Sequence, residues 1–191
     1  MSLNAVLPAG GALRLGSGGS LPVEPSLDMT AEHHYNVRLE WRGSNGIGTV
    51  SYAAYSRAHE LHGDGKQPIL GSADPHFRGD ATRWNPEELL IASLSACHQL
   101  WYLHLCAEAK IIVTAYEDFA DGTLALNADG SGEFISATLR PQVTIALGSD
   151  PEQAISLHGD AYRKCFIARS VKFPVTHEPK ITLGPRDECT T

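Results

Sequence analysis

Four cysteines are the residues of this sequence best suited to chemistry. They are Cys97, Cys106, Cys165 and Cys189, and no two of them have CxxC spacing. Four thiols in 191 residues are too sparse for a disulfide scaffold, and the lack of a CxxC pair argues against zinc ribbons and thioredoxin-like motifs. Because a thiolate is a nucleophile, each cysteine has to be judged by its own surroundings.

Cys97 and Cys106 lie in one apolar segment that is predicted to be helical. Nine residues separate them, about 900° of helix rotation, so they lie on opposite faces and cannot form a disulfide within one chain. The neighbours of Cys97 one turn away are mostly apolar and disfavour a thiolate; they are Ser93, Leu94, Leu100 and Trp101. A reactive Cys97 would therefore need help from another group.

Two histidines of the same segment are poorly placed to activate Cys97. His98 points about 100° away around the helix, and His104 lies two turns on, roughly 10 Å along the axis. The Cys97-His98 pair is therefore weak support for a cysteine hydrolase, which would need a histidine from elsewhere in the fold. These histidines and the upstream His59 and His62 also lack zinc-ligand spacing, so we expect no metal site.

The segment around the first cysteine has the signals of a long buried helix. Asn85 is an N-cap candidate, Pro86 fits the first helical position, and Glu87 and Glu88 complement the helix dipole. The helix is expected to continue to about Lys110, roughly 24 residues or 36 Å. Since it is apolar around most of its circumference, we expect it to be covered on all sides.

The same segment is long enough to cross a membrane. Residues 89–107 carry no formal charge, which meets the length rule for a spanning helix. However, polar side chains interrupt the run, acidic residues precede it, and no positive flank would set its orientation. We therefore expect a buried helix of a soluble protein and no membrane span.

Strand signals stand on both sides of this helix. Residues 35–41 alternate as a half-buried strand, and an Asn-Gly turn leads into residues 49–52, which predicts a hairpin. The polar stretch 55–80 is expected to form strand fragments and loops. Three segments after the helix are predicted to form a meander: residues 111–118, 123–127 and 134–146, the last interrupted by Pro141.

A second helix is predicted after the meander. Ser149 and Glu152 have capping-box spacing at its start, and Cys165 stands near its end. Its apolar stripe consists of Ala154, Leu157, Ala161 and Cys165. Residues 181–183 are expected to form a last short strand.

Composition narrows the class of partner. The chain has 15 Lys+Arg against 22 Asp+Glu, a net charge of −7, and no block of like charges, so neither nucleic acid nor an anionic membrane is an expected partner. Charged residues make up 19% of the chain, below the roughly 25% of a typical soluble domain. More surface than usual is therefore expected to be buried, some of it between chains.

The length suits one domain, which we place at residues 31–185. Residues 1–30 are rich in Gly and Pro and are expected to be a flexible leader, and residues 186–191 a polar tail. The start of the sequence lacks a signal-peptide pattern, so we expect a cytoplasmic location, where thiols stay reduced.

The motifs around two of the cysteines resemble those of the OsmC/Ohr family, the osmotically inducible protein C and organic hydroperoxide resistance proteins. The shared pattern is Asn85-Pro86-Glu87-Glu88 with Cys97 ten residues after the first Glu, and a second cysteine 68 residues later in Cys165-Phe166-Ile167-Ala168. The resemblance covers about residues 35–183. It implies an α+β fold with antiparallel sheets around a long central buried helix plus a second helix, in an intertwined homodimer.

The resemblance also implies a function. Members are thiol-dependent peroxidases that reduce organic hydroperoxides in oxidative stress defence, so the expected partners are a hydroperoxide substrate and a second copy of the chain. No bound cofactor is implied, and the reductant would be an external dithiol such as a lipoylated protein.

Site residues follow from the resemblance position by position. Cys97 matches the peroxidatic cysteine, Cys165 the resolving one, and Glu87 the glutamate of an activating Arg–Glu pair. For the arginine we choose Arg78, with Arg83 in reserve. A bulky alkyl hydroperoxide would be bound by apolar side chains. The expected ones are Leu94, Leu100 and Trp101.

Helix geometry places these residues in two chains. Glu87 lies ten residues, about 15 Å, from Cys97 on the same helix, too far to serve that thiol directly. Antiparallel packing of two such helices near Ala92 would bring Glu87 of one chain near Cys97 of the other. We therefore expect the active sites at a dimer interface.

Two other functions stay open. One is a non-catalytic dimer of the same fold that binds a small lipid or acyl ligand, and the other is a cysteine hydrolase that uses Cys97. Cys106 is expected to be a buried core residue without a chemical role, and Cys189 a tail thiol without one.

Overall fold

The computed structural model describes residues 32–185. The predicted leader at 1–30 and the predicted tail at 186–191, which includes Cys189, lie outside the described residues. Every helix and strand described belongs to one compact unit that begins at Asn36.

The first sheet is antiparallel and consists of β1 (Arg38–Trp41), β2 (His59–His62) and β3 (Ile69–Gly71). β1 pairs with β2, with Trp41 opposite His59. The predicted hairpin between residues 35–41 and 49–52 is therefore wrong in its second strand. Residues 45–55 form turns instead, and the Asn-Gly pair lies at the start of this long loop, with both residues at positive φ. The loop closes where Ser56 N donates to Gly43 O, so pairing resumes later than an Asn-Gly hairpin would require.

Two further sheets carry the remaining strands. β4 (Val113–Asp118), β7 (Pro141–Ala146) and β9 (Lys180–Gly184) form one, and β5 (Asp121–Leu126), β6 (Gly132–Leu139) and β8 (Val175–His177) form the other. Apart from β8, which was not predicted, the segments agree with the predicted strands, and Pro141 opens β7, where a missing N–H is tolerated. The predicted meander is wrong, because β4 pairs with β7 and β5 with β6 in separate sheets. The expected α+β fold with antiparallel sheets is confirmed, and each of these two sheets is mixed, because β8 pairs parallel to β6 and β9 parallel to β7. A helix connects β7 with these two strands, which makes the parallel pairing possible.

The long helix α1 spans Pro86–Glu108. Asn85 caps it: its side chain accepts from Glu88 N at 2.7 Å, and the Glu88 carboxylate accepts from Asn85 N at 3.1 Å. This reciprocal pair satisfies two backbone N–H groups that the first turn would leave without partners. The start signals in the sequence were therefore sufficient to place this helix.

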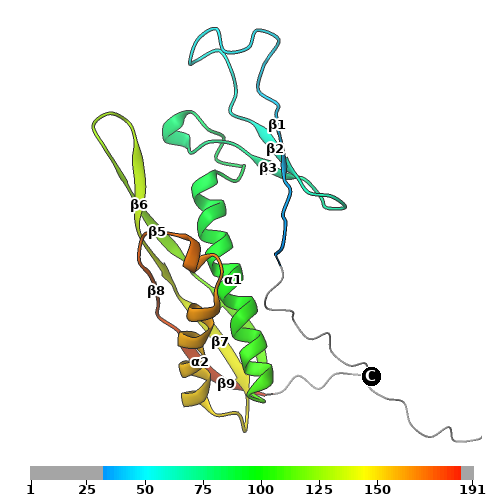
Figure 1. Cartoon of the computed structure of the whole chain (residues 1–191), viewed down its shortest axis with the longest axis vertical. Coiled ribbons are helices and arrows are strands. Elements are labelled where there is room, and N and C mark those ends of the chain that lie inside the picture. The colour runs from blue at the N-terminus through cyan, green and yellow to red at the C-terminus, as the bar shows by residue number, and fades with distance from the viewer. Residues whose placement is uncertain (1–31, 186–191) are drawn as a thin grey trace, which may run out of the picture. The chain divides into compact units, whose positions relative to one another are not determined.

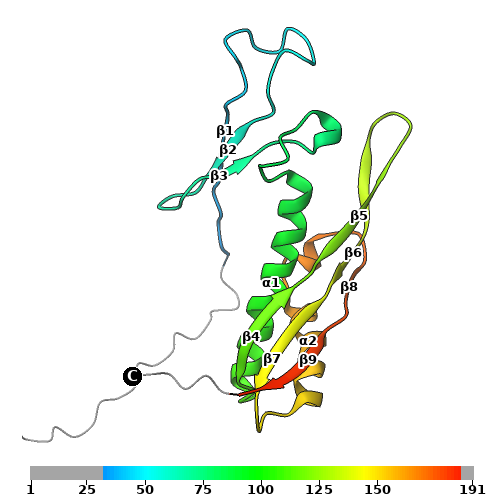
Figure 2. The same cartoon turned by 180° about the vertical axis from the view of Figure 1, so that it is seen from behind.

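The second helix, α2, spans Pro151–Lys164, and Cys165 follows as its C-cap. Its N-cap is Asp150, whose side chain accepts from Glu152 N and Gln153 N, so the predicted Ser149–Glu152 capping box is wrong. Ser149 instead accepts from Ile112 N. Figures 1 and 2 show both helices on the same side of strands β4 to β9.

The main core lies where α1, α2, β4 and β7 meet. Its large members are Tyr102, Leu105, Ile111, Val143 and Ile145, with Ala154 and Ala161 allowing α2 to approach closely. A second cluster surrounds Leu94, from α1, at β6 and β8. Both clusters use the same side of α1.

The other side of α1 is not covered within one chain. Ala92, Ala96 and Leu100 form an exposed stripe at four-residue spacing, and Leu100 is 67% exposed. The predicted cover on all sides is thus incomplete in the single chain. α1 is long and apolar enough to cross a membrane by length and composition alone, a test that the core helix of a soluble protein also passes.

Candidate functional site

The fold brings the two predicted redox cysteines together. Cys97 lies on α1 and is half-buried, whereas Cys165 caps α2 and is 1% exposed. Both are free thiols. Burial and a hydrogen bond with the Cys97 thiol raise the pKa of Cys165 to about 11. Cys165 Sγ also accepts from Ala168 N at 3.3 Å, in the turn that follows α2.

Cys106 lies elsewhere, in the main core. It is 1% exposed and packs beside Tyr102, and burial raises the pKa of its thiol. An inert thiol of this kind agrees with the expected core role.

The predicted substrate-binding residues do not form one pocket around the thiol pair. Leu94 is fully buried in the second core cluster, and Leu100 points outward from α1. Trp101 is half-buried and packs edge-on against Phe166, the residue after Cys165, with ring centroids 5.6 Å apart. Only Trp101 thus lies against the segment that carries the second thiol.

Glu87 occupies the first turn of α1, and one of its carboxylate oxygens is buried without a hydrogen-bond partner among residues 32–185. The two arginines proposed to pair with it lie apart. Arg78 ends a short 3-10 helix at a positive φ of 64° and is exposed. Arg83 forms an ion pair with Asp80, with Nε 3.6 Å from Oδ2. Within the described chain, neither arginine forms an ion pair with Glu87.

Arg57, which the sequence analysis missed, shares a cavity with Glu87. The cavity has a volume of about 360 Å³ and is also lined by Trp41, Tyr55 and Phe77. The position of Arg57, in a polar stretch without recognisable motif, offered no local signal. Only the folding of that stretch against the start of α1 places it beside Glu87.

The Arg57 side chain is held rigidly. Its Nη1 donates to Tyr55 O at 2.6 Å and its Nη2 to Tyr52 O at 2.7 Å. The guanidinium carbon lies 4.2 Å from the Tyr52 ring centroid and 4.3 Å from that of Tyr55. Planar stacking and two fixed hydrogen bonds orient an arginine in a way that lysine could not reproduce.

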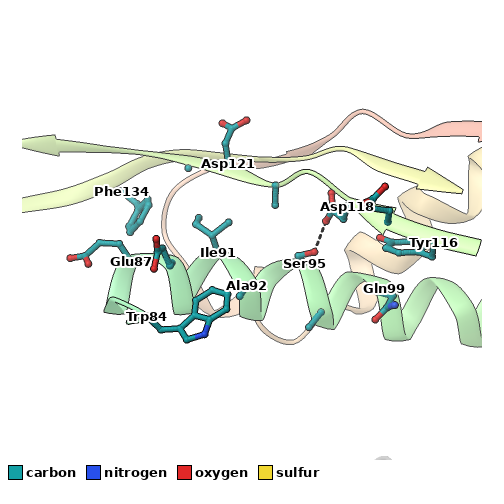
Figure 3. Close-up of a pocket in the computed structure, with 15 residues that line it drawn as sticks. Trp84, Glu87, Ile91, Ala92, Ser95, Gln99, Tyr116, Asp118, Asp121 and Phe134 are labelled. Atoms are coloured by element: carbon teal, nitrogen blue, oxygen red, sulfur yellow. Dashed lines mark hydrogen bonds between the residues drawn. The ribbon is translucent and has the colours of Figure 1, made fainter. Parts of the chain in front are cut away.

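A larger groove lies on the other side of Glu87. It has a volume of about 650 Å³ and runs between α1 and strands β4 to β6, as Figure 3 shows. Ile91 and Ala92 contribute apolar surface from α1, and Ser95 Oγ donates to Asp118 at 2.5 Å across the groove. Cys97 lines neither the groove nor the Arg57 cavity. Within one chain, the thiol pair and the Arg57–Glu87 cavity are therefore separate.

Two histidines form a buried, hydrogen-bonded pair next to Cys97 in the sequence of α1 and on the facing helix α2. His98 Nε2 lies 2.9 Å from His158 Nδ1, and the two rings are parallel, with centroids 5.2 Å apart. Burial lowers the pKa of His98 to about 4 and that of His158 to about 3, so both are neutral at pH 7. Within residues 32–185, no histidine forms a hydrogen bond with Cys97, so one chain by itself gives the hydrolase alternative no support.

A cluster outside these sites has metal-ligating residue types. Ligand atoms of Glu40, Glu60 and His62, on β1 and β2, lie within 4.8 Å of one another. Arg42 already pairs with both carboxylates, and Arg38 donates to Glu40 at 2.7 Å. The cluster is thus a half-buried ion-pair network, whose carboxylates are already neutralised by arginines.

Comparisons with known proteins find similarity to one protein family. The model of the OsmC-like protein family matches residues 79–180. The solved structure of an OsmC-like protein of unknown function from Vibrio cholerae is 33% identical, with a TM-score of 0.71, over 78% of this chain and 100% of that one. No curated protein matches the chain.

More distant structures share the fold. An organic hydroperoxide resistance protein OsmC from Legionella pneumophila is 15% identical, with a TM-score of 0.56, over 80% of this chain and 98% of that one. An organic hydroperoxide resistance protein from Elizabethkingia anophelis is 16% identical, with a TM-score of 0.57, over 82% and 100%. At these identities the likeness concerns the fold alone.

Proposed function

Because this chain belongs to the OsmC-like protein family, we propose that it is a thiol-dependent peroxidase that reduces organic hydroperoxides in oxidative stress defence. The observation that carries the proposal is the contact between Cys97 and Cys165, two thiols 68 residues apart in the sequence. A half-buried thiol beside a buried one is the arrangement that a peroxidatic and a resolving cysteine require.

The chemistry proceeds in three steps. The Cys97 thiolate attacks the terminal oxygen of the hydroperoxide; the O–O bond breaks, the alkoxide leaves and takes up a proton as the alcohol, and Cys97 becomes a sulfenic acid. The Cys165 sulfur then attacks the sulfenic sulfur, which forms the disulfide and releases water. An external dithiol, such as that of a lipoylated protein, reduces the disulfide by thiol exchange, so no bound cofactor is needed.

Activation of Cys97 is assigned to a second copy of the chain. Glu87 and Arg57 share a cavity about 15 Å along α1 from Cys97, which is too far for a direct contact within one chain. Antiparallel packing of two α1 helices at Ala92, midway between Glu87 and Cys97, would place the cavity of one chain near the thiol of the other. The exposed stripe at Ala92, Ala96 and Leu100 is the surface that this homodimer would bury.

The guanidinium has a clear task in such a site. It stabilises the thiolate by charge, while the carboxylate of Glu87 holds it in place. Arg57 replaces Arg78 as our choice, because Arg57 shares a cavity with Glu87 and is held by two hydrogen bonds. The chain would act as a soluble enzyme in the cytoplasm, where thiols stay reduced.

Consumption of cumene hydroperoxide with dihydrolipoamide as reductant tests the proposal. Wild type should turn over, Cys97→Ser should lose at least about 100-fold in kcat/KM because the nucleophile is gone, and Cys165→Ser should stop after one turnover with Cys97 over-oxidised. Cys106→Ser is the matched control, since that thiol lies in the core away from the pair, and should retain activity. Wild-type rates in Cys97→Ser would exclude the proposal.

A further inference from the structure

Three aromatic rings interlock α1 and α2 close to the thiol pair. The His158 ring of α2 contacts His98 and Tyr102 of α1, which are one helical turn apart: its edge meets the edge of the His98 ring, and its face lies on the Tyr102 ring. Its centroid is 5.2 Å from that of His98 and 3.8 Å from that of Tyr102, and it is nearly parallel to both. One hydrogen bond of 2.9 Å, between His98 Nε2 and His158 Nδ1, joins the two histidines.

Each histidine is linked to one of the thiols along its own helix. His98 directly follows Cys97, and His158 precedes Cys165 by seven residues, almost two turns and therefore on the same face of α2. Any axial shift of α2 on α1 would move Cys165 relative to Cys97 by the same distance. These contacts oppose such a shift, because it would break the hydrogen bond between His98 and His158 and slide the His158 ring off Tyr102.

The pair is costly for stability alone. His98 and His158 are 1% and 0% exposed, and His98 Nδ1 and His158 Nε2 have no hydrogen-bond partner in the described chain. Apolar side chains of the same shape would fill this space without unpaired polar atoms. A buried hydrogen bond of this kind is best explained by the register that it specifies.

We propose that His98 and His158 are positioning residues that fix the register of α2 on α1 and so hold Cys165 in place for disulfide formation with Cys97. That this disulfide is the resolving step of a peroxidase rests on the function proposed above. The positioning itself concerns only the two thiols and the two helices.

Geometry explains why register matters here. A disulfide requires Cα atoms within about 4.4–6.8 Å, and a one-residue slip of a helix moves its side chains by about 1.5 Å and rotates them by 100°. Cys165 is also a weak nucleophile at pH 7, because burial and the neighbouring thiol raise its pKa to about 11. With so little thiolate, the rate depends on how well the two sulfurs are held together.

The test measures closure of the disulfide with and without peroxide. Diamide takes two electrons and two protons from the Cys97 and Cys165 thiols, forming the disulfide and the hydrazine, and needs no peroxidase activity. His158→Phe keeps a ring on Tyr102 but loses the hydrogen bond. We expect closure by diamide to slow at least about tenfold in this variant, and the disulfide potential to become about 30 mV less negative for each tenfold loss of effective concentration.

Two further variants separate register from general damage. His158→Asn retains an amide near the Nδ1 position and should recover part of the rate. His177→Phe is the matched control, because the His177 ring lies 6.3 Å from that of His158 and 5.7 Å from that of His98 without a hydrogen bond to either; it should close at the wild-type rate. If His158→Phe does not fold, two variants at position 98 give the same comparison. His98→Gln keeps a donor near the Nε2 position, whereas His98→Phe loses the hydrogen bond.

The outcomes distinguish the two proposals. With cumene hydroperoxide, trapping of the Cys97 sulfenic acid by dimedone should be as fast in His158→Phe as in wild type, and only its conversion to the disulfide should slow. Equal closure rates in wild type and His158→Phe, or equal slowing in His177→Phe, would overturn the positioning role. Slow closure by diamide in a protein that never reacts with hydroperoxide would leave that role standing and refute the peroxidase instead.

Discussion

Arg57 shows how a single residue becomes suited to a site through its neighbours. Two backbone carbonyls and two tyrosine rings fix its guanidinium beside the cavity that also contains Glu87. The arginines chosen by sequence, Arg78 and Arg83, are an exposed loop residue and a partner of Asp80. A fixed guanidinium can stabilise a thiolate without first losing its own conformational freedom.

At the residue scale we predict that Arg57→Lys impairs the oxidation of Cys97. Lysine keeps the charge but loses the planar fork and the stacking, so kcat/KM for cumene hydroperoxide should fall by about 10- to 100-fold. Disulfide closure after sulfenic acid formation should stay unchanged. Arg78→Lys serves as the control, and a larger loss in that variant would return the role to Arg78.

At the scale of elements, α1 and α2 depend on a neutral histidine pair. No carboxylate forms an ion pair with His98 or His158 in the described chain, and the rings that face them are those of His177 from β8 and Tyr102 from α1. Protonation of either imidazole would therefore place an unpaired charge between the helices. The contact between α1 and α2 should be sensitive to acid.

We predict that stability falls as pH decreases from about 6.5 towards 4. The pKa values of His98 and His158 in the fold are about 4 and about 3, below the ordinary 6.5, so the unfolded chain binds more protons across this interval. The contribution of the neutral histidine pair to the free energy of unfolding is thus fully present above pH 6.5. As the pH falls below that value, each imidazole lowers the free energy of unfolding by up to about 1.4 kcal/mol per pH unit.

Urea denaturation at several pH values would measure this slope. The slope between pH 6.5 and 5 should become shallower in His158→Asn. It should persist in His104→Gln, because His104 lies on an exposed part of the same helix. An identical slope in wild type and His158→Asn would contradict the prediction.

At the scale of the whole molecule, one chain leaves apolar surface without cover. The Ala92–Ala96–Leu100 stripe of α1 is exposed, as are Val37, Leu39 and Trp41 at the first sheet. These apolar surfaces partly explain why only 19% of the residues are charged. A soluble protein rarely leaves so much apolar surface in water, which supports the homodimer proposed above.

We predict that Ala96→Glu separates this dimer. A carboxylate at the centre of the stripe would be buried between two helices without a partner, which costs several kcal/mol, roughly 3–5. Light scattering after size exclusion should give twice the 20.6 kDa of one chain for wild type and a single-chain mass for the variant, with loss of peroxidase turnover.

Ala107→Glu provides a matched control for that experiment. Ala107 is an exposed alanine of the same helix, eleven residues beyond Ala96 and outside the proposed crossing. The Ala107→Glu variant should remain dimeric. Wild type that elutes as a single chain while it still reduces hydroperoxide would exclude an interface site.

The sequence by itself determined what depends on neighbouring residues. The start of α1 at Asn85, the strands that follow it except β8, and the family motif around Cys97 could be predicted, because caps, alternation and spacing act within one or two turns. The predicted hairpin at residues 49–52 and the Ser149 cap failed because several local choices were nearly equivalent and tertiary contacts selected among them.

Only the tertiary structure decided which distant residues meet. The contact of Cys97 with Cys165, the shared cavity of Arg57 and Glu87, and the contacts of His158 with His98 and Tyr102 join segments 30 to 68 residues apart. The parallel pairing of β8 and β9 is of the same kind. Such contacts leave no periodic signal in the sequence, because they arise from the packing of whole elements. The burial that raises or lowers the pKa of a side chain also exists only once that packing is complete.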